Sequence, residues 1–148
     1  NNIIILYMFN DEVFGITVGY ITTLSIITGL YLAGAKKEIY IASLMAILIS
    51  DPLSHLFAFN ISSSVLEWKG VLYQLIVNMQ IILTFLLSND MKSALIMSYF
   101  LCAITNVAMF FHSYSWNHIL ISIFGTFFIV AIHYPLHKLA FKFIKYYK

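Results

Sequence analysis

The chain has 148 residues, of which 61% are hydrophobic, 17% aromatic and only 9% charged, and its formal net charge is +2. A soluble domain carries roughly a quarter charged residues. This composition therefore excludes an ordinary water-exposed surface and indicates an all-α integral membrane protein. The single cysteine, Cys102, excludes an intrachain disulfide and a cysteine-based metal cluster.

Five apolar segments are long enough to cross a bilayer, which takes about 20 helical residues. Each is continuously apolar rather than alternating with a period of two, so the pattern favours helices over a β-barrel. The connectors between the segments are short, and neighbouring helices should therefore run antiparallel within a single transmembrane domain. The expected spans are residues 13–34, 39–61, 70–88, 93–111 and 118–136.

The positions of the lysines predict the orientation of this bundle. The N-terminus and the second and fourth connectors would share one side, which holds only Lys69. The first and third connectors and the C-terminal segment would share the other side, which holds the remaining seven lysines. Lysine-rich loops stay on the cytoplasmic side, so we expect the N-terminus outside and the C-terminus inside. The basic segment 137–148 should continue the last helix along the membrane surface.

The first span carries small residues on approximately one face. Gly15 and Gly19 form a small-xxx-small pattern, and Thr22, Gly29 and Ala33 extend it. Helices in lipid associate through such close backbone approach. We expect this face to pack on a neighbouring helix, either of the same chain, which we favour, or of a second copy.

The second span contains the most informative residue, Asp51. An ionised carboxylate at that depth costs at least about 2.5–3.5 kcal/mol, so it needs a partner, a water path or a function. Ser54 and His55 share its helical face. Pro52 cannot donate to the carbonyl of Leu48, which predicts a broken helix beside the carboxylate, as in many cation sites of transporters. A structural hydrogen bond to another helix is the alternative.

Uncharged polar side chains recur in the later spans, among them Gln74 and Asn78, one turn apart in the third. Such side chains usually bond to one another across helices, so we expect packing contacts there. Met45, in the second span, offers a thioether, which is a soft ligand for transition metals. Methionine is more often a packing residue, however.

Three stretches of the first 62 residues resemble the vacuolar iron transporter-like family. Residues 10–19 resemble its first-helix signature, an Asn-Asp-Gly start followed by small residues, although Glu12 replaces the glycine. Residues 29–37 resemble the end of that helix, and residues 49–62 resemble the second helix, in which an Asp and a Ser precede a closing Ile-Ser.

This resemblance implies a five-helix subunit that dimerises and moves divalent iron or manganese, often against protons. Asp11 and Asp51 would inherit the metal role, with Met45 as a weaker candidate. The chain departs from the family pattern at His55, where small members often carry a second Asp, and it has no room for the Glu-rich cytosolic helices. Its lysines also predict the opposite orientation.

Two functions are therefore weighed. The first is a membrane transporter for a divalent cation (iron or manganese) or for protons. Its ion-binding residues would be Asp51, Ser54, His55, Asp11 and Met45. The alternative is a non-catalytic structural or accessory subunit of a larger, for example organellar, membrane complex. A third and weaker interpretation is a fragment of a membrane enzyme, based only on the His-Tyr-Pro-Leu-His sequence at residues 133–137.

No soluble-enzyme motif is visible, so we expect no enzymatic activity and no cofactor other than a transported divalent metal ion. The expected partners are the lipid bilayer and either a second copy or other membrane subunits. Nucleic acid is excluded because the basic residues gather at one membrane surface. The Lys-, Asn- and Ile-rich composition is typical of AT-rich genomes. The expected location is therefore the plasma membrane or an organelle membrane such as the mitochondrial inner membrane.

Overall fold

The computed structural model of this chain is helical, and the residues that it describes include no strand. Four helices are described without interruption, namely α1 (Asn2–Leu32), α2 (Lys37–Ser62), α3 (Trp68–Leu87) and α4 (Met91–Phe111). Each contains a segment long and apolar enough to cross a membrane. The structure describes residues 2–62, 68–111, 116, 120, 123–125, 127–128, 131–132, 135–136, 138–139 and 142, without the side chains of 2–11, 59–62 and 110–111.

The structure bears on three expectations about the spans. The first span, expected at 13–34, agrees with the apolar segment Glu12–Leu32, and the helix that contains it begins earlier, at Asn2. The second helix is not broken, since α2 runs through Pro52. A proline removes one hydrogen bond, and packing can compensate for that loss, as Pro52 is itself buried. Of the expected fifth span, 118–136, ten residues are described and all ten are helical, whereas only three residues of the segment 137–148 are described, so the fifth span stays a prediction.

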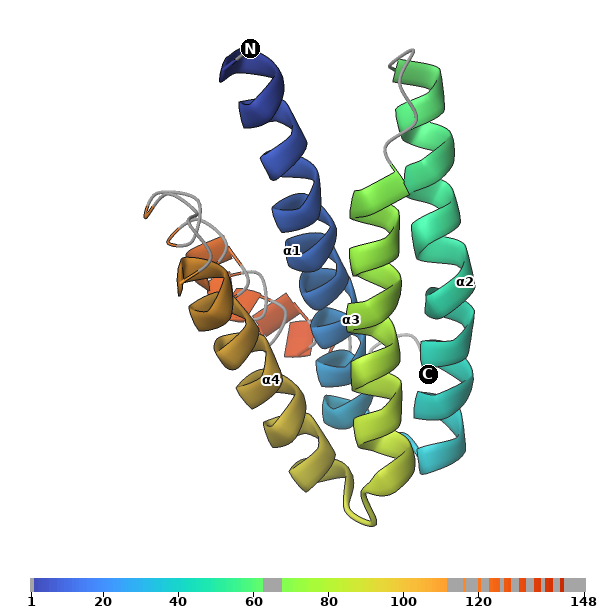
Figure 1. The fold of residues 1–148 in the computed structure, drawn as a ribbon. Coiled ribbons are helices and arrows are strands. Elements are labelled where there is room, and N and C mark those ends of the chain that lie inside the picture. The colour runs from blue at the N-terminus through green and yellow to red at the C-terminus, as the bar shows by residue number, and fades with distance from the viewer. Residues whose placement is uncertain are drawn as a thin grey trace.

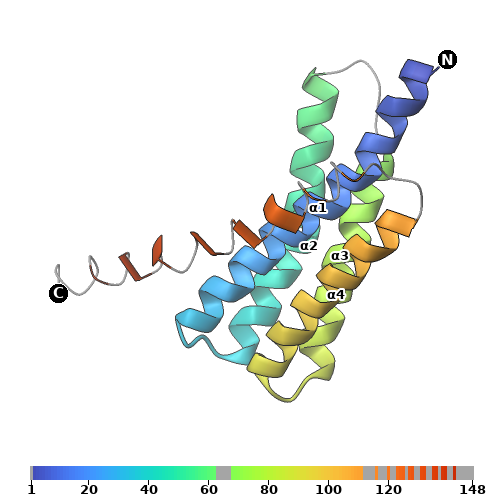
Figure 2. The same cartoon turned by 90° about the vertical axis from the view of Figure 1, so that its left-hand side faces the viewer.

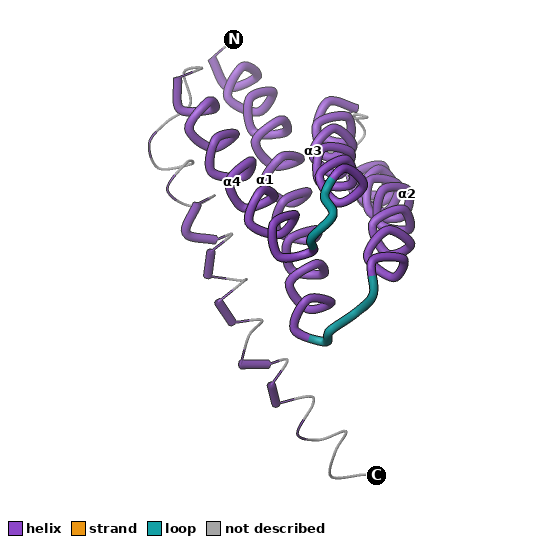
Figure 3. Tube along the Cα trace, turned by 90° about the horizontal axis from the view of Figure 1, so that it is seen from below, coloured by secondary structure: helices purple, strands orange, loops and turns teal. Residues whose placement is uncertain are grey.

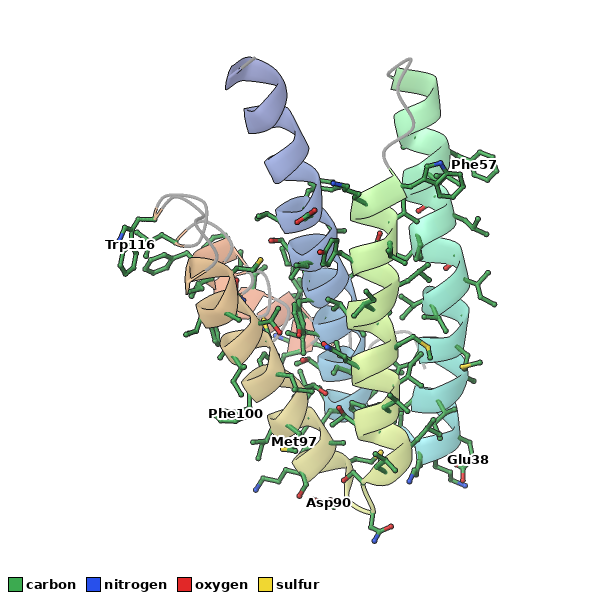
Figure 4. The ribbon with its side chains drawn as sticks, viewed as in Figure 1. Glu38, Phe57, Asp90, Met97, Phe100 and Trp116 are labelled. Carbon is green, nitrogen blue, oxygen red and sulfur yellow. The ribbon has the colours of Figure 1, made fainter. Side chains whose placement is uncertain are left out.

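The four helices run up and down, in the spatial order α4, α1, α3, α2 (Figures 1 and 3). The turns at residues 33–36 and 88–90 lie at one end of the bundle, which we call the first-connector end. Figure 4 places Glu38 and Asp90 at this end. The start of α1, the end of α2 and the start of α3 lie at the opposite end, called the second-connector end. The predicted grouping of these connectors is thus confirmed, and which end faces the cytoplasm stays a prediction.

Small residues let α1 approach α3 closely, backbone to backbone. A Cβ atom added to Gly15 would lie 2.7 Å from the carbonyl carbon and 2.8 Å from the Cα of Gly70 on α3. One turn on, a Cβ at Gly19 would lie 3.2 Å from Cγ1 of Val77. The small face expected on the first span therefore packs within the chain at these two glycines. Ala33, by contrast, is exposed.

Apolar packing and a lysine hold the helices together at the first-connector end. The rings of Tyr40 on α2 and Phe85 on α3 stack with their centroids 5.2 Å apart, and both side chains are buried. The ammonium of Lys37 donates to the carbonyl of Ser88, 2.7 Å away, at the end of α3. Gly34 has a positive φ of 66°, which ends α1 in the left-handed conformation that glycine adopts without strain. This end of the bundle is consequently compact.

Candidate functional site

The candidate site is a junction of three helices around the carboxyl group of Asp51. The side chain of Asp51 is half-buried near the middle of α2. Its Oδ2 accepts a hydrogen bond of 2.8 Å from the hydroxyl of Thr22 on α1 and one of 2.7 Å from the amide nitrogen of Gln74 on α3. Asp51 therefore has partners on both neighbouring helices. We call Thr22, Asp51, His55 and Gln74 the Asp51 cluster.

The side-chain amide of Gln74 links Asp51 to His55. Gln74 is fully buried, and its Oε1 lies 2.8 Å from Nδ1 of His55. Because its nitrogen donates to the carboxyl group, its oxygen is the acceptor for the imidazole, and Nδ1 of His55 must carry a proton. The reverse orientation of the amide would bring its oxygen against a carboxyl oxygen. In this orientation Gln74 accepts from Nδ1 of His55, and Nε2 takes no part in the cluster.

The hydroxyl of Thr22 has one proton but two acceptors at equal distance. Its Oγ1 lies 2.8 Å from the carbonyl of Val18 and 2.8 Å from Oδ2 of Asp51. If Asp51 is ionised, Thr22 donates to the carboxylate. If Oδ2 is protonated, Asp51 donates to Thr22, which then donates to Val18, while Oδ2 still accepts from Gln74. The cluster can therefore satisfy both protonation states without moving a heavy atom.

Further polar and aromatic groups follow the cluster toward the second-connector end. The ring of Phe14 on α1 lies 5.8 Å from the imidazole of His55, tilted by 53°. Beyond it, the ammonium of Lys69 on α3 is 3.8 Å from a carboxylate oxygen of Glu12 on α1. The side chain of Lys69 is 57% exposed, so this ion pair lies at the surface of the bundle and contributes little to stability.

The other predicted ion-binding residues do not join the carboxyl group. The hydroxyl of Ser54 donates to the backbone carbonyl of Asp51, at 2.8 Å, rather than to its side chain. Met45 is 47% exposed, and it lies six positions before Asp51, which turns it about 240° around the helix. The side chain of Asp11 lies outside the described residues. Within the described part of the chain, no three His, Cys, Asp or Glu side chains gather as a metal site would require.

Two members of the cluster were not expected there from the sequence. Thr22 was assigned to the small packing face of the first span, and Gln74 to ordinary interhelical contacts. Their depth in the expected spans did not indicate the pairing, because Gln74 is the fifth residue of 70–88, whereas Asp51 is the thirteenth of 39–61. Only the packed structure brings the long side chain of Gln74 to the carboxyl group.

Comparison with known proteins adds no relative: no family model, no curated protein and no solved structure matches this chain. The resemblance to vacuolar iron transporter-like proteins therefore stays a prediction.

Proposed function

We propose that this chain is a transporter-like membrane protein that binds and releases a proton at Asp51. The observation that supports this most is the position of the Thr22 hydroxyl between two acceptors. With it, Oδ2 of Asp51 keeps its hydrogen-bond partners whether the carboxyl group is charged or neutral. An ionisable residue inside a membrane marks an ion or proton pathway by default, and this one can change its charge at little structural cost.

A proton suits the cluster better than a divalent metal. A metal ion would need several oxygen or nitrogen ligands at once. Oδ2 of Asp51 and Nδ1 of His55 are already engaged by Gln74, and Ser54 and Met45 point elsewhere. A transported metal ion, as the family resemblance implies, is kept as one outcome of the experiment below.

The test is proton flux in vesicles that contain the purified protein and a pH-sensitive dye. Asp51→Asn keeps an oxygen that can accept from Thr22 and Gln74 but cannot take up a proton. Glu38→Gln is the matched control, because it removes an exposed carboxylate from the same helix, far from the cluster. We expect flux through the wild type and Glu38→Gln, and none through Asp51→Asn. Equal flux in Asp51→Asn would refute the proposal, and flux that requires added Fe²⁺ or Mn²⁺ would identify the cotransported ion.

A structural or accessory subunit is the second candidate. It is favoured by the two interhelical hydrogen bonds of Asp51, because such bonds are ordinary packing contacts in membrane proteins. A subunit would purify from its native membrane with other chains, and Asp51→Asn would leave that assembly intact. The same variant thus separates the two candidates. The enzyme-fragment interpretation depends on residues 133–137, which lie largely outside the described part of the chain.

A further inference from the structure

The surroundings of Asp51 differ between the two ends of the bundle. Toward the second-connector end, one turn along α2, lies His55, which Gln74 connects to the carboxyl group. Farther on, the ion pair of Glu12 and Lys69 connects the first turns of the two apolar segments of α1 and α3. A series of groups that can bind water or protons therefore extends from Asp51 to this end.

Toward the first-connector end, the same three helices meet through apolar side chains. Leu44 on α2, Ile81 and Phe85 on α3 and Ile27 on α1 are each 0–1% exposed. Polar contacts on this side include the 2.8 Å bond of Thr23 to Asn78, both of which are buried, and the bond of Lys37 to Ser88 at the end of the bundle. Water would have to cross this apolar layer to reach Asp51 from the first-connector end.

The arrangement of the helices agrees with this difference between the two ends of the bundle. A short turn ties α1 to α2 at the first-connector end, whereas their other ends stand apart in two perpendicular views (Figures 1 and 2). The helices α1 and α2 contact each other much less than either contacts α3. They are therefore least constrained on the side of Asp51 that faces the second-connector end.

We infer that this conformation is the resting state of the protein, in which Asp51 exchanges its proton with one side of the membrane only, the side of the second-connector end. Transport then requires a transient second conformation that exposes Asp51 to the other side. This inference rests on the proposed proton-binding role of Asp51. In the cluster, water from that side meets Nε2 of His55, while Nδ1 holds Gln74 in the orientation that serves the carboxyl group. The apolar layer around Leu44 and Phe85 blocks exchange with the opposite side.

Few other ionisable groups share this half of the bundle with Asp51. Among the described side chains of α1, α2 and α3, they are Glu12, His55, Lys69 and Tyr73. Tyr20 on α1 turns its hydroxyl away, to Gln80 and Thr105. In the test below, the Asp51→Asn variant separates the titration of Asp51 from that of these groups.

The test uses a hydrophobic carbodiimide, which dissolves in the bilayer and reacts with protonated carboxyl groups. Sealed vesicles hold the full chain, and the pH is set independently on each side during a short reaction. Mass spectrometry then measures the labelling of Asp51, with Asp51→Asn as the blank. The orientation of the protein is read with an impermeant amine reagent, which distinguishes Lys69 from Lys36 and Lys92.

We expect acidification by about two pH units on the second-connector side to raise the labelling of Asp51 several-fold, because the protonated fraction rises with acidity. The same change on the first-connector side should leave labelling unchanged. Leu44→Ser should make labelling respond to both sides, because it places a hydroxyl in the apolar layer. Met45→Ser, at the neighbouring exposed position, is the control and should behave as the wild type.

Labelling that follows the first-connector side, both sides or neither side in the wild type would overturn the inference, whatever Leu44→Ser does. The labelling and the proton flux together distinguish a failure of this inference from a failure of the proposed function. One-sided labelling without proton flux would refute transport and leave one-sided access standing. Proton flux with labelling from both sides would refute one-sided access alone.

Discussion

Replacing Gly15 by alanine should open the contact between α1 and α3. The added Cβ would lie 2.7 Å and 2.8 Å from two backbone atoms of Gly70 and nearer still to its carbonyl oxygen. Backbone atoms cannot rotate away as a side chain can, so the two helices must separate. Overpacking of this kind costs about 3 kcal/mol at the upper end of its usual range. The better helix propensity of alanine returns about 1 kcal/mol, which leaves a net loss of about 2 kcal/mol.

Gly19→Ala is the matched control one turn away. Its Cβ would lie 3.2 Å from Cγ1 and 3.3 Å from Cβ of Val77, a side chain that can shift by a few tenths of an ångström. We expect a stability close to that of the wild type. The assay is reversible unfolding in mixed micelles on addition of SDS, followed by helical circular dichroism and by the fluorescence of Trp68, which adjoins the contact. If Gly15→Ala were as stable as Gly19→Ala, the close approach of α1 to α3 would be wrong.

Three further predictions address the polar contacts. Gln74→Leu should lower the free energy of unfolding by about 1–3 kcal/mol in the same assay, because it leaves the carboxyl group of Asp51 with one donor fewer. An unchanged stability would contradict the hydrogen bond from Gln74 to Asp51. Tyr20→Phe should lose about 1 kcal/mol, since the buried hydroxyl has partners on two helices. The hydroxyl and then the backbone N–H of Ser93 hold the pKa of Asp90 below its ordinary 3.8. These hydrogen bonds from Ser93 to the Asp90 carboxylate are therefore present above pH 3.8 and are lost as the pH falls through the lowered pKa. The backbone amide of Ser93 should then exchange its hydrogen faster in strong acid. Asp90→Asn should not show this change.

The hydrophobic pattern predicted most of the fold because lipid imposes a simple rule on the chain. The expected spans 39–61, 70–88 and 93–111 differ from α2, α3 and α4 by at most two residues at either end. The pattern was less informative about the start of α1. Residues 3–9 are apolar, but Asn10, Asp11 and Glu12 separate them from the expected span, and the helix continues through these polar residues to Asn2.

The candidate site was predicted only as far as a single helix allows. Asp51 and His55 were evident, because they are ionisable side chains one turn apart in an apolar segment. Thr22 and Gln74 could not be assigned to them, since that requires the relative depth and rotation of three helices. Small errors in either would give Asp51 different partners. The break expected at Pro52 failed for a related reason, because packing around a buried proline is a property of the bundle.

The remaining polar contacts give a reason to attribute chemistry, rather than packing, to Asp51. Neutral pairs already join α1 to its neighbours, as in the bonds of Thr23 to Asn78 on α3 and of Thr28 to Tyr99 on α4. Helix α2 is held by apolar stacking and by its lysine at the first-connector end. An asparagine at position 51 would accept the same hydrogen bonds without the cost of a charge in lipid. What the carboxyl group adds is a proton that can leave, and it sits where α1 and α2 are least constrained.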